Sequence, residues 1–239
     1  MRGRLLIAAV AVVAALALAG GGAYVYFFSG LRTSPNAPGL STPSAAASGT
    51  AATSSDLTGT WKVATGSLAE YRVKELFVGE TSKHVAVADT PTVSGGFTVN
   101  RDSSGYQASA ITITAVLTDL HSVDSVAGRN VAQRDGFVAR QMNLQQFPNA
   151  TFTATSAAVA GTDTSQPVNV TIPGKLTIHG VTRDVTASGK AQVTNGKIEI
   201  AGSVSILMTD YGVTPPSVPF TTVDPQVTID FHIFLARAS

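Results

Sequence analysis

The sequence predicts an all-β domain in which an antiparallel sheet folds into a sandwich or an up-and-down barrel. Three observations predict it. Most of the chain after residue 56 alternates apolar and polar side chains with a period of two, as strands with one buried face do. Short runs of Gly, Asn, Asp and Pro separate the alternating stretches. Only 13% of the 239 residues are charged, and 22 are glycine.

The clearest turn signal lies within residues 174–188. Leu176 and Ile178 share one face of a strand, and His179 faces the other way. Beyond Gly180 the alternation resumes. Because glycine adopts a positive φ at little cost, Gly180 predicts a tight turn between two half-buried strands. By the same alternation His179 lies on the outward face, where we expect it to make a hydrogen bond at the turn or the surface.

The same alternation marks further strands and brings the total to about eight or more. Trp61 stands at the start of the domain and is expected to close the base of the sheet. Most inward-facing side chains are aliphatic or aromatic and are expected to form core. Besides the hairpin, the predicted strands cover residues 61–64, 69–73, 93–99, 111–117, 152–154, 197–201, 204–208 and 227–235.

Two segments break the alternation. Residues 121–148 fit irregular or short helical structure, and we expect them to cross over an open end of the sheet and to bury their apolar side chains there. Residues 209–225 contain prolines that exclude a central strand. We expect this second segment to form the opposite lip of the same structure.

The chain before residue 56 differs from the domain in composition. Residues 5–28 carry no charge over 24 positions; at about 1.5 Å per residue they span about 36 Å, enough to cross a hydrocarbon core of about 30 Å. Arg2 and Arg4 precede this segment, which places residues 1–4 in the cytoplasm and the domain outside. A cleaved signal peptide is the alternative, because residues 17–19 resemble a cleavage site.

Residues 29–55 are rich in Ser, Ala, Thr and Pro and are predicted to be a disordered linker. The chain therefore divides into a cytoplasmic N-terminus (1–4), a transmembrane signal anchor (5–28), the linker and a β domain (56–239). The expected location is the cell membrane, crossed once, with the domain extracytoplasmic. If residues 5–28 are cleaved, the domain is secreted.

Charge and cysteine content exclude several classes of protein. The net charge of +1 divides into +3 before residue 56 and −2 from there onward, and a weakly acidic domain is a poor partner for nucleic acid. The chain contains no cysteine, which excludes disulfides, thiol catalysis and thiolate metal sites. The four histidines show no metal-ligand spacing, and no G-x-S-x-G motif is present.

Four motifs together resemble the YceI-like family of bacterial lipid-binding proteins, and specifically its actinobacterial members. They are Arg134-Asp135, residues 147–152 (FPNATF), residues 174–182 (GKLTIHGVT) and residues 210–212 (DYG). Their order and approximate spacing match the family, and the resemblance covers residues 56–237.

The resemblance implies an extended, lipocalin-like antiparallel barrel of eight strands that holds an isoprenoid or a similar long-chain amphiphile. It also implies an exported protein that is not an enzyme. We expect no cofactor and no metal. Ligand-binding side chains are then expected on the inward faces and in the crossover. They are Tyr71, Phe97, Ile113, Arg134, Phe137, Met142, Leu144, Phe152, Ile178, Ile200, Met208 and Phe231.

Arg134 and Asp135 leave two interpretations open. They can form a local ion pair or helix cap that holds the crossover to the barrel, or Arg134 can face an anionic head group, since arginine suits phosphate through bidentate hydrogen bonds.

Two other functions remain alternatives to a lipid carrier tethered to the membrane. One is an interaction module without bound lipid, in which a solid barrel displays loops to a partner. The other is an envelope hydrolase, which needs a polar pocket that joins His179 or His232 to an acid and a hydroxyl. The sequence predicts no oligomeric state.

Overall fold

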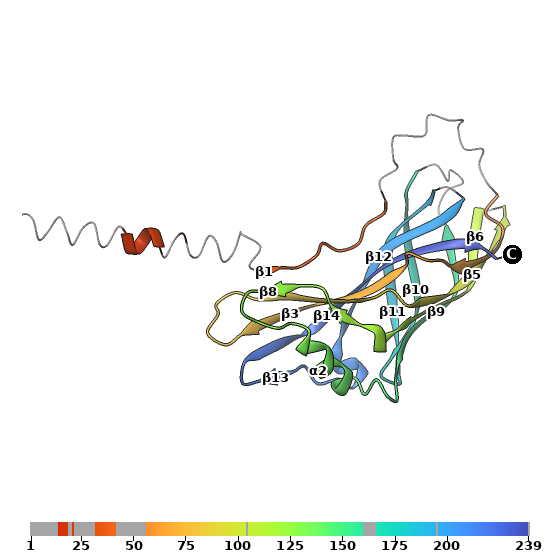
Figure 1. Cartoon of the computed structure of the whole chain (residues 1–239). Coiled ribbons are helices and arrows are strands. Elements are labelled where there is room, and N and C mark those ends of the chain that lie inside the picture. The colour runs from red at the N-terminus through yellow and green to blue at the C-terminus, as the bar shows by residue number, and fades with distance from the viewer. Residues whose placement is uncertain are drawn as a thin grey trace, which may run out of the picture.

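Eight antiparallel strands form a closed barrel among the residues that the structure describes, which are 14–18, 21, 32–41, 56–103, 105–159, 166–194 and 196–238. Figure 1 shows the computed structural model of the chain. β14 pairs with β12 to close the ring, so the prediction of an all-β, eight-stranded antiparallel barrel is confirmed. In order around the ring the strands are β12 (Lys197–Leu207), β11 (Val181–Thr194), β10 (Val168–Ile178), β9 (Asn149–Val159), β6 (Gly105–Val116), β5 (Val93–Asp102), β2 (Gly59–Val63) and β14 (Thr221–Arg237).

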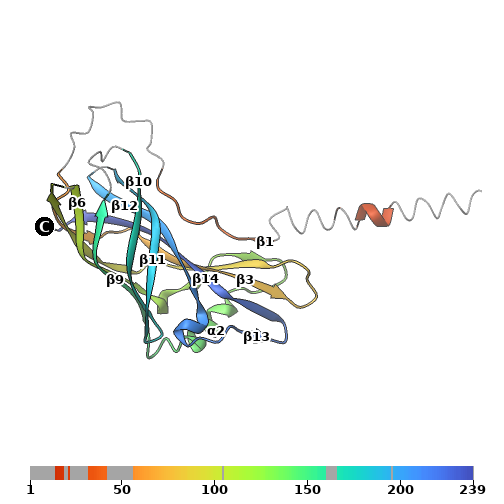
Figure 2. The same cartoon turned by 180° about the vertical axis from the view of Figure 1, so that it is seen from behind.

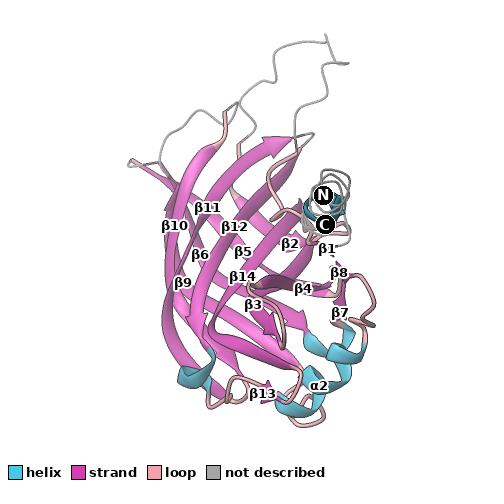
Figure 3. Ribbon diagram, turned by 90° about the vertical axis from the view of Figure 1, so that its left-hand side faces the viewer, coloured by secondary structure: helices cyan, strands magenta, loops and turns pink. Residues whose placement is uncertain are grey.

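The sheet continues beyond one end of this ring. β3 (Leu68–Phe77) pairs with the first part of β14 and with β4 (His84–Thr90). The short strands β7 (His121–Ser122) and β13 (Ser217–Val218) pair with β4 and β14. Helix α2 (Gln133–Gln141) and the 3-10 helices η1 (Leu117–Asp119) and η2 (Met208–Tyr211) also lie here, at the lower end in Figure 3. We call this end of the barrel the wide end and the other the narrow end.

The hairpin between β10 and β11 has the predicted tight turn, and Figure 2 shows the two strands side by side. Ile178 pairs directly with Val181, so His179 and Gly180 alone form the loop. Both have positive φ, 52° and 73°, as a type I′ turn requires. The His179 ring N–H at Nδ1 donates to the Tyr211 carbonyl at 3.1 Å, which confirms the turn hydrogen bond expected for this histidine.

β14 is longer than predicted. It begins at Thr221 rather than at residue 227, because its first residues pair with β3 beyond the ring. The register of this pairing shifts between Val223 and Val227, and Pro225 lies inside the irregularity. Proline is tolerated there because no ladder hydrogen bond requires its missing N–H. Residues 209–225 therefore contain two short paired segments instead of a wholly irregular lip.

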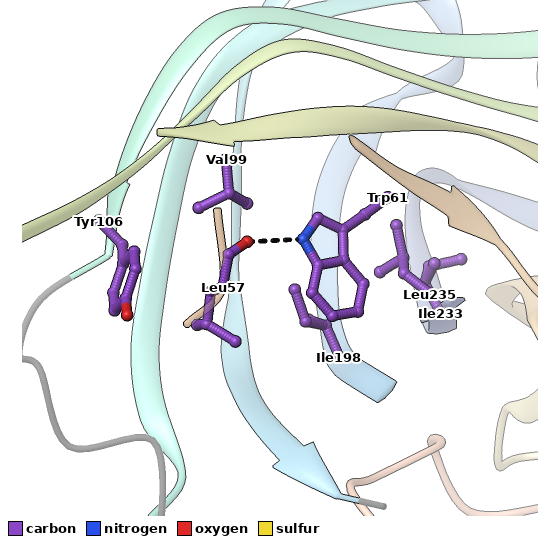
Figure 4. Close-up of a cluster of buried hydrophobic side chains, with 7 residues drawn as sticks. All are labelled: Leu57, Trp61, Val99, Tyr106, Ile198, Ile233 and Leu235. Atoms are coloured by element: carbon purple, nitrogen blue, oxygen red, sulfur yellow. Dashed lines mark hydrogen bonds between the residues drawn. The ribbon is translucent and has the colours of Figure 1, made fainter. Parts of the chain in front are cut away.

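Trp61 closes the narrow end, as predicted. Its side chain is 1% exposed and packs with Val99, Ile198 and Leu235. The indole N–H donates to the Leu57 carbonyl at 2.8 Å, so the polar atom of the ring is satisfied although it is buried (Figure 4).

Two facing glycines let β11 and β12 approach closely. Gly189 of β11 pairs with Gly202 of β12, which in turn pairs with Phe231 of β14. A Cβ at Gly202 would meet the Ser188 carbonyl oxygen and would lie 2.9 Å from the ring of Phe231. The absence of a side chain at this position therefore sets where the Phe231 ring lies in the lumen.

We expect Gly202→Ala to lower the free energy of unfolding by about 1 to 3 kcal/mol, because the new methyl group overpacks a backbone contact. Ser205→Ala, at an exposed position of the same strand, is the matched control and is expected to change it by less than about 0.5 kcal/mol. Urea unfolding measures both. Equal effects from the two variants would show that β11 and β12 can separate at no cost.

Part of the predicted linker lies against the barrel. We call residues 32–41 the docked segment. Its first residues form β1 (Arg32–Thr33), which pairs with β8 (Ser125–Val126), and Arg32 also forms an ion pair with Glu80 and a hydrogen bond to Ser82. Arg72 donates to the Pro35 carbonyl at 2.5 Å.

The docked segment ends near the narrow end of the barrel. There the N–H and hydroxyl of Ser41 donate to Glu199 of β12 at 2.6 and 2.8 Å. Burial raises the pKa of Glu199, but hydrogen bonds from Gln192, Ser41 and His232 outweigh it and lower the pKa to about 2. The carboxylate is thus ionised at neutral pH and binds the segment to the barrel wall.

Within the described part of the chain, no helix has both the length and the apolar character needed to cross a membrane. Of the predicted anchor at residues 5–28, only residues 14–18 and 21 belong to that part, and they are helical. The rest of the anchor lies outside the described residues, so the transmembrane segment stays a prediction.

Candidate functional site

The barrel encloses an apolar space at the narrow end, which we call the narrow cavity. It has a volume of about 190 Å³ and is lined by side chains of every ring strand except β2. Ala, Val, Ile, Leu and Phe account for almost all of the lining. Such a lining offers shape and burial to a ligand, with little hydrogen bonding.

A second space, the wide cavity, lies between the wide end of the barrel and the segments that cover it. Its volume of about 770 Å³ falls within the range of small-molecule sites. Residues 128–144, which include α2, form one wall, and residues 211–221 form another. Val126 and Leu144 of the crossover are buried, as predicted, whereas Phe137 is exposed.

Four residues line both cavities: Ala69, Ala115, Ala150 and Ile229. The cavities therefore adjoin, and we call these four residues the neck. Three of the four are alanines, which have small side chains. A larger residue at any of them would narrow the passage between the cavities.

Every residue predicted to bind ligand lines one of these cavities, although ligand contact itself stays a prediction. β5, β6, β9, β12 and β14 bring Phe97, Ile113, Phe152, Ile200 and Phe231 into the narrow cavity. The residues at the wide cavity are Tyr71, Arg134, Phe137, Met142, Leu144, Ile178 and Met208.

The neck was not predicted, although the sequence carries a signal for it. Ala69, Ala115 and Ala150 each stand two positions from a predicted inward-facing residue, and therefore on the same face of their strands. A small residue at an inward position is ordinarily read as core, so this signal alone does not distinguish a neck from close packing.

Arg134 is held by carboxylates of the barrel. Its guanidinium donates to Glu75 and to Asp124, both at 2.7 Å. His84 Nε2 lies 2.6 Å from Asp124, and the N–H of Val87 donates to the same carboxylate at 3.0 Å. Burial raises the pKa of Asp124, but the hydrogen bonds from His84, Arg134 and Val87 outweigh it and hold the pKa well below its usual range.

Arg134 therefore holds the crossover to the barrel through ion pairs, as one interpretation expected, but its partners are Glu75 and Asp124 and not a local group. Asp135 does not pair with Arg134; it accepts hydrogen bonds from the N–H and hydroxyl of Ser122 in β7. Arg134 and Asp135 therefore fix the start of α2 to β3, to β7 and to the loop that follows β7.

Glu75, His84 and Asp124 also bring three potential metal-ligand atoms within 4.8 Å of one another. Sequence spacing did not reveal this cluster, because its members lie 9 to 49 residues apart. The guanidinium of Arg134 already supplies a cation to both carboxylates, and His84 is bonded to one of them. The arrangement fits an ion-pair network better than a metal site.

Tyr71 contributes an unpaired polar atom to the wide cavity. Its hydroxyl is buried and has no hydrogen-bond partner among the described residues. Burial raises the pKa of Tyr71, so the hydroxyl is neutral and can donate. A buried donor without a partner is costly, and a ligand oxygen in the cavity would satisfy it.

The side chains around His232 are not arranged as the catalytic groups of a serine hydrolase are. Glu199 lies between the two other groups, accepting from His232 at 2.6 Å and from the Ser41 hydroxyl at 2.8 Å. A nucleophilic serine needs the histidine as its neighbour, because the histidine removes its proton. The Ser41 hydroxyl instead donates to the carboxylate.

We expect Arg134→Met to lower the free energy of unfolding by about 3 to 5 kcal/mol, because it leaves Glu75 and Asp124 buried without their cation. Arg140→Met, an exposed position of the same helix, is the matched control and should change it by less than about 0.5 kcal/mol. Urea unfolding at neutral pH measures both. Adding Glu75→Gln and Asp124→Asn to Arg134→Met should restore part of the loss. A loss below about 1 kcal/mol for Arg134→Met, typical of exposed pairs, would contradict this account.

Comparison with known proteins places the fold in a family. The YceI-like domain model matches residues 53–235, and the chain belongs to the YceI-like family. The resemblance seen in the sequence is thereby confirmed. UPF0312 proteins of Pseudomonas putida are 26% identical over 137 residues, which is 54% of this chain and 65% of theirs. The match thus covers less than two thirds of the length of these relatives.

Two solved structures share the fold. A polyisoprenoid binding domain from Saccharophagus degradans, implicated in plant cell wall breakdown, has a TM-score of 0.52 at 17% identity, over 76% of this chain and 99% of that one. BcnA of Burkholderia cenocepacia has a TM-score of 0.51 at 18% identity, over 72% of this chain and 98% of that one.

Proposed function

We propose that this protein sequesters or carries an isoprenoid or another long-chain amphiphile in its joined cavities, by burial and without covalent chemistry. We further propose that it does so outside the cytoplasm, tethered to the membrane by residues 5–28 or secreted if they are cleaved. The observation that carries the proposal is the pair of largely apolar cavities that adjoin at the neck. The polyisoprenoid binding domain from Saccharophagus degradans, which shares the fold, supports the choice of ligand.

The passage suits a slender chain because burial supplies the affinity. Each buried CH₂ contributes about 0.8 kcal/mol, so a five-carbon unit contributes about 3 to 4 kcal/mol before the costs of association. Walls made almost entirely of aliphatic and aromatic side chains distinguish ligands by length and shape. An interaction module needs a solid barrel, whereas this barrel holds a cavity of about 770 Å³ at its wide end.

The polar groups of the wide cavity favour an uncharged head group. Tyr71 offers an unpaired hydroxyl. Arg134 lines the same cavity, but its N–H groups bond to Glu75 and Asp124, so two carboxylates face one guanidinium. A carbonyl or hydroxyl oxygen would accept from Tyr71, whereas the guanidinium of Arg134 is already bonded to two carboxylates and is a poor partner for a phosphate.

The full chain, released from membranes with mild detergent and purified, should yield a stoichiometric long-chain amphiphile on solvent extraction and mass spectrometry. We expect Ala115→Phe to lose this amphiphile or to retain a shorter one, because the ring fills the neck and excludes the units beyond it. The loss of one five-carbon unit corresponds to a fall in affinity of more than about a hundredfold.

Ala132→Phe is the matched control, since Ala132 is exposed at the start of α2. It should carry the same amphiphile as the unchanged protein, whereas the Ala115→Phe protein reports the lipid carried over from the membrane. If no amphiphile is enriched over the Ala115→Phe protein in repeated preparations, the carrier function is wrong.

A further inference from the structure

Three large apolar side chains are exposed together at the opening of the wide cavity. Val78, Phe137 and Phe220 are 66, 45 and 48% exposed, and we call them the mouth patch. The rings of Phe137 and Phe220 lie 6.4 Å apart, and the N–H of Val78 donates to the Phe220 carbonyl at 3.1 Å. Phe137 and Phe220 also line the cavity, so the patch forms its rim.

The mouth patch combines tips of three separate segments: the turn after β3, helix α2 and the turn between β13 and β14. In Figure 1 these segments lie at the end of the molecule opposite the C-terminus. Contiguous exposed apolar side chains at such tips mark a surface that contacts another apolar phase or a partner.

Cations accompany the mouth patch. The guanidinium of Arg140 lies 4.8 Å from the centre of the Phe137 ring, and that of Arg129 lies 3.9 Å from the centre of the Phe77 ring. The acids nearby are paired: Glu80 with Arg32 and with Arg129, the latter at 3.8 Å, and Asp224 with Lys83. Aromatic rings with arginines beside them suit the interface of a bilayer, where rings enter the head-group region and the cations meet lipid phosphates.

The path of the chain determines which phase the patch faces. Arg32 is fixed to Glu80 and Ser82, within a few residues of Val78. Phe28 ends the predicted anchor only four residues earlier, and an extended chain covers at most about 3.6 Å per residue, so Arg32 lies within about 14 Å of it. An anchor in the membrane therefore brings this end of the barrel, and not the narrow end, to the bilayer surface.

We propose that the mouth patch docks onto the lipid bilayer, so that the wide cavity opens directly onto the acyl-chain region. This inference rests on the proposed membrane tether and deepens the carrier function. The docked segment connects the anchor to this end of the barrel. Val78, Phe137 and Phe220 then enter the head-group region of the bilayer. An amphiphile then passes between bilayer and cavity without its chain crossing water.

Fluorescent labels at single cysteines test this orientation, because the natural chain has no cysteine. An environment-sensitive label is attached at Val78→Cys or, in a second protein, at Phe220→Cys. Ser103→Cys, in the exposed turn between β5 and β6 at the other end of the barrel, is the matched control. Each full chain is reconstituted into vesicles of phosphatidylcholine and phosphatidylglycerol that carry a quencher near the head of the acyl chains.

We expect blue-shifted emission and severalfold stronger quenching for the labels at positions 78 and 220 than for the label at position 103. Three results would overturn the docking. The first is a water-like emission at both mouth positions, and the second is a protein that does not float with the vesicles. The third is a blue shift without lipid quenching, which would indicate that a second copy of the chain covers the mouth patch. Mass spectrometry of the same preparations reports the carrier function separately. A protein that carries amphiphile but shows water-like mouth labels refutes the docking alone, and docked labels without amphiphile refute the carrier function alone.

Discussion

The pairing of β12 with β14 is the interaction on which the rest of the structure depends. These strands lie at the two ends of the ring order, and their ten residue pairs convert an open sheet into a closed one. Closure leaves the ring without an edge and turns every inward face toward one enclosed space. An open sheet with the same sequence would expose that apolar face to water.

The enclosed space stays hollow because of a few small residues. A barrel of eight strands is close to the size at which side chains fill the lumen. Here Trp61 fills the narrow end, whereas the neck, where the two cavities meet, has three alanines with small side chains. The cavity is therefore a product of residue size at a few inward positions, and the strand pairing alone does not determine it.

The alternation of apolar and polar residues predicted the strands, whereas contacts between residues far apart in the sequence could not be predicted. Period-two alternation assigned Ile178 and Phe231 to the inward faces, and Gly180 marked its turn correctly, because each depends on neighbours in the sequence. The partners of Arg134 escaped prediction because Glu75 lies 59 residues away and meets it only in the closed barrel. The docking of residues 32–41 escaped for the same reason: Ser41 and Glu199 are 158 positions apart, and a segment without alternation carries no sign of such a bond.

The docked segment changes what kind of connection joins the N-terminal region to the barrel. A free spacer can be lengthened, shortened or exchanged for another polar sequence with little effect on the domain that it carries. Residues 32–41 are bonded near both ends of the barrel, at Glu80 and at Glu199, so they have one length and one direction. Residues 32–41 are therefore part of the folded domain. A fusion protein that carries the barrel should begin before Arg32 and not at residue 56.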